Sequence, residues 1–262
     1  MKMPRLQLFE FCDQAWLPQT LRQVFVETLD MIHEFTGNYR GVANLVARVA
    51  REIQADHLVD LASGGAGHLD MLLEEASDHN INIPKVIASD LHPIVGRWQR
   101  LRAKWGGGRF DYIECPVVAN DTLPSGTNFC SIFSAFHHFD PDYASKFLST
   151  TLAQVDAMII GEISTRSWAC LFYMVAGFPL IVLSPFVTGT FSWRRLFWVT
   201  VCPVASLIVM FDGVVTSLRT YTPVEIWAMV PDEVRQHFDY NVMQHKRLIG
   251  FSSWSMTIIR KK

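Results

Sequence analysis

The fold of this chain is decided by the stretch His57-Leu58-Val59-Asp60-Leu61-Ala62-Ser63-Gly64-Gly65-Ala66-Gly67. A short apolar run ends in an acid, passes through small residues and a Gly-Ala-Gly, and opens into residues 68–76, whose leucines follow helical spacing. The pattern predicts a strand, a glycine-rich turn and a helix. Such a turn presents backbone N–H groups and the positive end of a helix to a ligand, and its small side chains let the ligand approach the main chain.

The spacing of the glycines separates two classes of nucleotide ligand. A dinucleotide fingerprint needs G-x-G-x-x-G, but the pattern that starts at Gly65 continues with Gly67 and then Asp70, so the third glycine is absent. Residues 59–67 resemble the first motif of the class I S-adenosylmethionine-dependent methyltransferases, which is an apolar strand, an acid and a glycine-rich loop. Ala62 stands where many members have glycine, and the loop is one residue longer than the commonest form.

A second acid follows the next apolar run. Residues 85–91 read Lys-Val-Ile-Ala-Ser-Asp-Leu, and the apolar part stops at Asp90, one helix and one loop after the first strand. A carboxylate at the tip of a second parallel strand can accept both ribose hydroxyls of a bound nucleoside, although a lone aspartate at a strand end is often only a turn former. In the methyltransferases that this sequence resembles, this position holds the adenosine ribose, which implies that role for Asp90.

The resemblance implies S-adenosylmethionine as the cofactor and S-adenosylhomocysteine as its product. The glycines are expected at the methionine end of the cofactor, while Asp60 supports the loop or contacts the donor amine. Asn120 or Asp121 is expected to recognise the adenine. The complete set of expected cofactor-binding residues is Asp60, Ala62, Ser63, Gly64, Gly65, Gly67, Asp90, Leu91, Asn120 and Ser134.

Adjacent histidines follow the fourth expected strand, residues 128–135. Ligands of open α/β sheets lie beyond the carboxyl ends of the strands, so His137 and His138 are expected to face the site. A histidine there either removes a proton from an acceptor N–H or O–H or simply packs on a helix. Glu162, which ends the fifth strand, is expected to orient a histidine, contact the acceptor or cap the segment after the strand. Neighbouring residues of one loop rarely converge on one ion, so no metal is expected.

Residues 1–56 are expected to form a helical extension before the sheet, with its second helix near residues 42–52. In the family that the chain resembles, such an extension often closes over the donor and shapes the acceptor pocket. This implies Trp16, Tyr39 and Arg40 as substrate-binding residues, and Tyr173 is a further candidate. Core packing is the alternative for Trp16, because a buried tryptophan mainly supplies apolar area.

An apolar helical insertion, residues 164–217, follows the fifth strand. Between residues 168 and 211 the only charged residues are Arg194 and Arg195. The run is long enough to span a bilayer, but prolines interrupt it and the arginines would lie on the far side of the membrane. We therefore expect a roof over an apolar acceptor pocket, a homodimer contact or a peripheral membrane contact. The insertion and the Leu-Arg-Thr-Tyr-Thr-Pro run at 218–223 resemble one lineage of bacterial methyltransferase-like proteins.

Composition narrows the class of partner. A net charge of -2 leaves no basic excess for a phosphate backbone, so a small-molecule substrate and no nucleic acid are expected. The five cysteines contain no C-x-x-C pair, and their odd number excludes a complete disulfide framework. The first residues lack the continuous apolar core of a signal peptide. These features predict a cytoplasmic protein, with membrane association as an open alternative.

The expected fold is α/β, a Rossmann-like seven-stranded methyltransferase sheet with an antiparallel final hairpin near residues 238–259. We expect a helical N-terminal extension, residues 1–56, and a methyltransferase domain, residues 57–262. The expected function is S-adenosylmethionine-dependent methyl transfer to an O or N atom of a small, hydrophobic or aromatic acceptor. The alternatives are an NAD(P)-linked oxidoreductase and a non-catalytic membrane-surface or binding protein with the same fold.

Overall fold

The computed structural model describes residues 3–39, 41–119, 122–186, 192–246 and 252–261. The chain divides into two compact units. The sheet unit comprises Tyr39–Glu162, Thr222–His245 and Trp254–Lys262. The helical unit comprises Met1–Asn38, Ile163–Tyr221 and Lys246–Ser253.

The strands form one seven-stranded sheet in the order β3-β2-β1-β4-β5-β7-β6. Parallel pairing joins β3, β2, β1, β4 and β5, whereas β7 runs antiparallel to β5. The central strands β4 and β5 are buried along their whole length, as expected for parallel strands covered on both faces. The strands are β1 His57–Leu61, β2 Lys85–Ala88, β3 Phe110–Tyr112, β4 Phe129–Phe133, β5 Ala157–Glu162, β6 Phe238–Lys246 and β7 Ser252–Arg260. The predicted seven-stranded sheet with a final antiparallel hairpin is confirmed.

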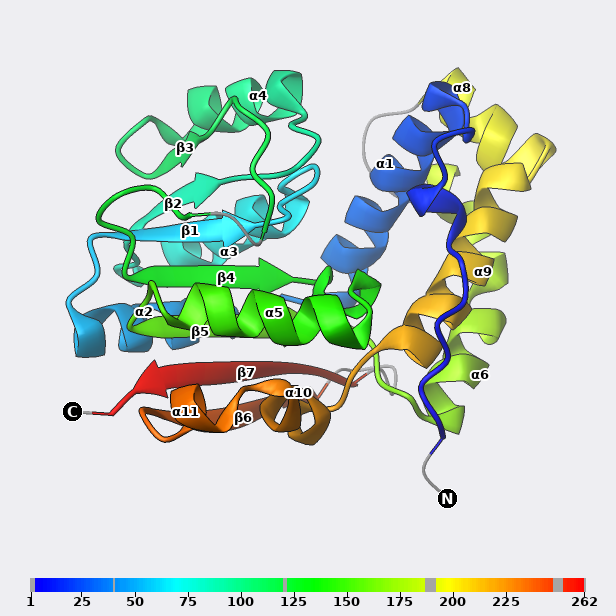
Figure 1. Ribbon diagram of the computed structural model, residues 1–262. Helices are drawn as coiled ribbons and strands as arrows, with labels where there is room; N and C mark the ends of the chain where they lie inside the picture. The colour runs from blue at the N-terminus through cyan, green and yellow to red at the C-terminus, as the bar shows by residue number, and fades with distance from the viewer. Residues whose placement is uncertain (1–2, 40, 120–121, 187–191, 247–251, 262) are drawn as a thin grey trace. The chain divides into compact units, whose positions relative to one another are not determined.

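Helices flank both faces of this sheet, with α5 and α10 in front and α2 and α3 behind in Figure 1. Local signals set where they begin. The Asp140 side chain accepts the Tyr143 N–H at the start of α5, and Thr222 and Glu225 form a capping box at the start of α10. The helices of the sheet unit are α2 Val42–Ile53, α3 Gly67–Asp78, α4 Val95–Trp105, η2 Phe136–His138, α5 Pro141–Leu152, α10 Pro223–Met229 and α11 Asp232–Arg235.

The helical unit has its own apolar core. Phe25 of α1 packs with Ile181 of α7 and with Ile208 of α9, so the first long helix and the insertion bury their apolar sides together. The elements of this unit are η1 Phe11–Asp13, α1 Gln19–Thr36, α6 Trp168–Ala176, α7 Phe178–Leu183, η3 Ser184–Phe186, α8 Trp193–Leu196, the π-helical turn η4 Phe197–Val201 and α9 Val204–Arg219. The two helices expected in residues 1–56 thus belong to different units, because α1 packs on the insertion whereas α2 packs on α3.

Candidate active site

The loop between β1 and α3 is held by its neighbours on the sheet. The Gly64 N–H donates to Asp90 Oδ2 at 2.7 Å, and the Gly64 carbonyl accepts from Trp98 Nε1 of α4 at 3.1 Å. Gly64 has a φ of +50°, and a Cβ at this position would meet no atom of the described residues within 4 Å. The main chain of the loop is therefore fixed from the β2 and α4 side, while the described residues leave space open at the α-carbon of Gly64.

Non-glycine residues with positive φ gather around this loop. Ala62 has a φ of 54°, Ala66 of 56° and Ser134, which follows β4, of 50°. The left-handed region is less favourable for an L-residue than its ordinary conformations by about 1 to 2 kcal/mol. Ala62 stands where many members of the family that the sequence resembles have glycine, and its backbone has a conformation that glycine adopts readily. Such backbone strain gathers at functional sites.

Asp60 is fully buried at the centre of a hydrogen-bond network. Its Oδ1 accepts from Ser131 Oγ of β4 at 2.6 Å. Its Oδ2 accepts from Ser63 Oγ of the loop at 2.7 Å and from His68 Nε2 of α3 at 2.9 Å. Asp60 thus joins β1 to β4, to the glycine loop and to the first turn of α3.

Asp90 lies at the carboxyl end of β2 and points at the glycine loop. Besides its contact with Gly64, its Oδ1 accepts from the His92 N–H at 2.7 Å. Each carboxylate oxygen offers two lone pairs, so both oxygens retain capacity for a further donor. The neighbouring Leu91 is 47% exposed. The two acids that the sequence singles out therefore frame the same loop from adjacent strands.

Tyr39 lies at the carboxyl end of β4 and is buried. Its hydroxyl and Ser134 Oγ are 2.9 Å apart and share a hydrogen bond. Its ring packs against His68 at 5.6 Å and edge-on against Phe133 at 6.0 Å, measured between ring centroids. A substrate-binding candidate and a cofactor-binding candidate are therefore in direct contact, beside the histidine that binds Asp60.

The histidines of η2 lie beyond the same strand. His137 Nδ1 is 2.9 Å from Glu162 Oε2, and the His137 N–H donates to Glu162 Oε1 at 3.1 Å. The ring of His138 stacks on that of His137 with centroids 4.3 Å apart. His137 and Glu162 are buried, whereas His138 is partly exposed. When Nδ1–H donates to the carboxylate, the lone pair of His137 resides on Nε2.

The other predicted residues belong to the helical unit or fall outside the described residues. Trp16 and Tyr173 belong to the helical unit, and Arg40, Asn120 and Asp121 lie outside the described residues. Trp16 is 65% exposed, with its ring edge-on to that of Phe11 at 5.9 Å. The core-packing alternative for Trp16 is therefore wrong, because most of its surface remains in contact with solvent.

Sequence reasoning missed His68, Trp98, Ser131 and Arg97. A Cβ added to Gly65 would lie 2.8 Å from Arg97 Nη1, so this guanidinium rests on the loop. Two of these residues carried a usable signal. Ser131 is a polar residue inside an apolar strand, and His68 opens the helix that follows the glycines. Each position favours a polar partner nearby, and Asp60 is that partner.

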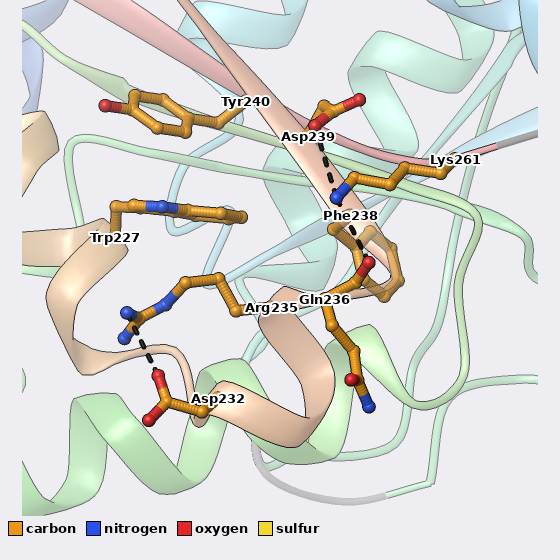
Figure 2. A pocket seen from close by; sticks show the side chains of 8 residues that line it. All are labelled: Trp227, Asp232, Arg235, Gln236, Phe238, Asp239, Tyr240 and Lys261. Atoms are coloured by element: carbon orange, nitrogen blue, oxygen red, sulfur yellow. Dashed lines mark hydrogen bonds and ion pairs between the residues drawn. The ribbon is translucent and has the colours of Figure 1, made fainter.

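A surface hollow also lies on the sheet unit, over α10, α11 and β6 (Figure 2). The Trp227 and Tyr240 rings stack there with centroids 4.7 Å apart. Its cations pair with its acids, since Arg235 lies 3.1 Å from Asp232 and Lys261 lies 3.6 Å from Asp239. The hollow shares no residue with the candidate site; its lining residues are Trp227, Asp232, Arg235, Gln236, Phe238, Asp239, Tyr240 and Lys261.

Comparisons with known proteins place this geometry in a fold family. No protein-family model and no curated protein matches the sequence. Among solved structures, the chain is similar to magnesium protoporphyrin IX methyltransferase (ChlM) from Synechocystis PCC 6803 with bound SAH. That similarity has a TM-score of 0.50 at 10% identity and covers 95% of this chain and 91% of that chain.

Two further solved structures are O-methyltransferases with ligands. A family 2 protein from Planctomyces limnophilus DSM 3776 in complex with apigenin has a TM-score of 0.54 at 9% identity, covering 94% of this chain and 63% of that chain. NcsB1 from neocarzinostatin biosynthesis, with SAH and 1,4-dihydroxy-2-naphthoic acid, has a TM-score of 0.51 at 16% identity, covering 91% and 58%. The chain thus spans about three fifths of these two proteins. It has the Rossmann-like fold of the class I S-adenosylmethionine-dependent methyltransferases.

Proposed function

We propose that this protein transfers the methyl group of S-adenosylmethionine to an oxygen or nitrogen atom of a small, hydrophobic or aromatic acceptor. The observation that carries the proposal is the bridge between Asp90 and the Gly64 N–H, which brings the acid of β2 onto the glycine loop of β1. In an open α/β sheet this is the edge at which nucleotide ligands bind.

The residues of the loop fit the cofactor. The helix α3 begins at Gly67, and its N-cap residue Ala66 provides no side-chain hydrogen bond to the helix end. Backbone N–H groups and the positive helix end therefore suit the carboxylate of the methionine part, beside Gly64 and Gly65. Asp90 retains acceptor capacity for the ribose hydroxyls. The bound cofactor supplies a methyl group on positively charged sulfur, so the protein mainly provides alignment and exclusion of water.

Asp60 has the contacts of a residue that supports the loop. Its oxygens accept from Ser63, His68 and Ser131, and it is fully buried. Of the two roles left open by the sequence, these contacts favour holding the loop in place over contacting the donor amine. A buried carboxylate with these donors makes the loop rigid before the cofactor binds.

For the acceptor proton we assign different roles to the adjacent histidines. Glu162 accepts from both the backbone and the ring of buried His137, which fixes that ring. His138 stacks on the fixed ring and is partly exposed. We therefore propose His138 as the general base and the His137–Glu162 pair as the group that positions it.

The acceptor class is supported by the ligands of two similar structures, apigenin and 1,4-dihydroxy-2-naphthoic acid, which are both aromatic. At this level of identity they indicate a class of acceptor and no particular compound. All five cysteines are free thiols, which supports a reaction in a reducing compartment such as the cytoplasm.

The test is label transfer from methyl-labelled S-adenosylmethionine to a panel of phenols, naphthols, aromatic amines and aliphatic acids. We expect S-adenosylhomocysteine to form with at least one aromatic acceptor. His138→Gln should lower kcat about a hundredfold. The matched control is His237→Gln, because His237 is an exposed histidine that follows α11.

Two results would replace the proposal with its alternatives. Binding of S-adenosylhomocysteine without turnover on any acceptor would indicate a non-catalytic binding protein. Binding of NAD(P) without binding of S-adenosylhomocysteine would indicate an oxidoreductase.

A further inference from the structure

The outward face of α6, α7 and η3 is apolar throughout. The large exposed side chains recur at helical spacing along this stretch, and a helix on the surface of a soluble protein normally presents its polar side there. Between 52% and 71% of each of these residues is exposed: Trp168, Phe172, Val175, Leu180, Leu183 and Phe186. Single exposed apolar residues are normal on proteins, but a continuous row of them marks an interaction surface.

The large exposed side chains of α9 are apolar, whereas four of its polar side chains are buried beside apolar ones. Val204, Leu207 and Phe211 are exposed. Each of its buried polar residues has a partner within the helical unit. The hydroxyl groups of Ser206 and Ser217 donate to the carbonyl groups of Val199 and Gly213, respectively. The Asp212 carboxylate accepts from the N–H groups of Phe11 and Cys12, and Arg219 forms an ion pair with Asp13. An apolar exposed side together with buried polar side chains that have partners is typical of a helix that faces hydrocarbon.

The two apolar rows belong to neighbouring helices, because α6 and α7 both pack against α9 (Figure 1). We call their exposed residues, together with Val201 of η4, the apolar face. Two exposed tryptophans belong to this unit: Trp168, which begins α6 and is part of the apolar face, is 71% exposed, and Trp193 at the start of α8 is 77% exposed. Tryptophan is enriched where membrane meets water, since its ring is apolar and its N–H is polar.

The stretch Trp168–Phe186 is long and apolar enough to cross a membrane, and 22% of its apolar window is buried. The stretches Trp193–Val201 and Val204–Arg219 meet the same criterion only together, with a bend of 66° between them. Parts of the unit are unsuited to the interior of a bilayer: residues 3–10 run beside α9 without helix or strand, although Leu6, Leu8 and Phe9 are exposed there, and Glu27 of α1 pairs with Arg194. Irregular backbone and charged pairs of this kind are not placed in hydrocarbon, so the helical unit suits contact with a membrane from one side.

We propose that the apolar face inserts into one leaflet of a lipid bilayer, which makes this a monotopic membrane protein. The occupant of the face is the acyl-chain region, because the apolar face itself carries no charged side chain to select a headgroup. Zwitterionic and anionic bilayers should therefore both be bound. The inference concerns the helical unit alone and does not depend on the proposed methyl transfer.

The test is flotation of the full chain with vesicles of phosphatidylcholine, and with vesicles of phosphatidylcholine and phosphatidylglycerol. We expect the protein to float with both. The double substitution Phe172→Glu and Leu180→Glu should lower the partition coefficient about a hundredfold. Each of these apolar side chains, once it is buried in the bilayer, raises the partition coefficient by more than about a factor of ten. The matched control is Val224→Glu, since Val224 is 68% exposed on α10 of the sheet unit. This variant should float like the native chain.

Three outcomes would overturn the proposal. If the native chain binds neither vesicle and sediments as a dimer that the double substitution dissociates, a second copy of the chain covers the apolar face. If binding requires phosphatidylglycerol and the double substitution leaves it unchanged, the headgroup charge binds a different surface. The fluorescence of Trp193 can be obtained as the difference between the native chain and Trp193→Phe. If lipids brominated near the bilayer centre quench this fluorescence more than lipids brominated near the headgroups, insertion is not one-sided.

Discussion

The substitution Ala62→Gly tests the geometry of the glycine loop. Ala62 has a φ of 54°, a conformation that disfavours an L-residue by about 1 to 2 kcal/mol. Glycine adopts it without that loss, but it gains freedom in the unfolded chain, which opposes folding by about 0.5 to 1 kcal/mol. The difference predicts that Ala62→Gly stabilises the protein by about 0.5 to 1 kcal/mol. For a chain of this size, Tm should rise by about 1 to 2 °C.

The assay is unfolding in urea followed by fluorescence, supported by a thermal melt of the same samples. The matched control is Ala103→Gly, because Ala103 is exposed in the last turn of α4, where glycine destabilises the helix by up to about 1 kcal/mol. The two alanine-to-glycine changes should therefore shift the free energy of unfolding in opposite directions. If Ala62→Gly destabilises the protein as much as the control, the backbone at residue 62 is not left-handed and the description of the loop is incorrect.

The network around Asp60 and the ion pairs of β3 give two further predictions. Asp60→Ala should lower the free energy of unfolding by about 3 kcal/mol, since it leaves buried Ser131 and the ring of His68 without their acceptor; a urea titration that shows a loss below about 1 kcal/mol would contradict this. Burial raises the pKa of Asp111, but hydrogen bonds from Lys85 and the Tyr112 N–H and the charges of Lys85 and Arg102 outweigh it, so the pKa lies below its ordinary value. Because the folded pKa is below the unfolded one, the ion pair stabilises the fold above the unfolded pKa, and this contribution is lost as the pH falls through the folded pKa. The Tm difference between the native chain and Asp111→Asn should therefore shrink as the pH falls from about 5 toward 2, and a constant difference would refute the assignment.

The sheet was predictable because its signals are local. The apolar run before Asp60, the glycines after it and the run that stops at Asp90 each depend on a few consecutive residues. The final hairpin was predictable for the same reason, since residues of β6 and β7 alternate between polar and apolar. The contact of Asp90 with Gly64 then agrees with the rule that parallel strands bring their carboxyl ends to one edge.

Other features depend on contacts between distant residues and could not be predicted. The bond from His68 to Asp60 depends on how the first turn of α3 faces β1. The separation of α1 from α2 depends on the packing of Phe25 against the insertion, which is distant along the chain. The exposure of Trp16 was missed because a tryptophan beside apolar residues favours burial, whereas here the aromatic residues gather on the surface.

The central claim is that the glycine loop and Asp90 together hold a sulfonium nucleoside, and calorimetric titration with S-adenosylhomocysteine tests it most directly. The control is Asp156→Ala, because Asp156 lies at the amino end of β5, whereas Asp90 follows the carboxyl end of β2. Asp156 forms an ion pair there with Arg260. We predict that the native chain and Asp156→Ala bind equally. Asp90→Ala should bind at least about a hundredfold more weakly, since it loses two hydrogen bonds from ribose hydroxyls to a charged acceptor, each of about 1.5 kcal/mol or more. Equal affinity of Asp90→Ala and the native chain, or no binding by the native chain, would contradict the account.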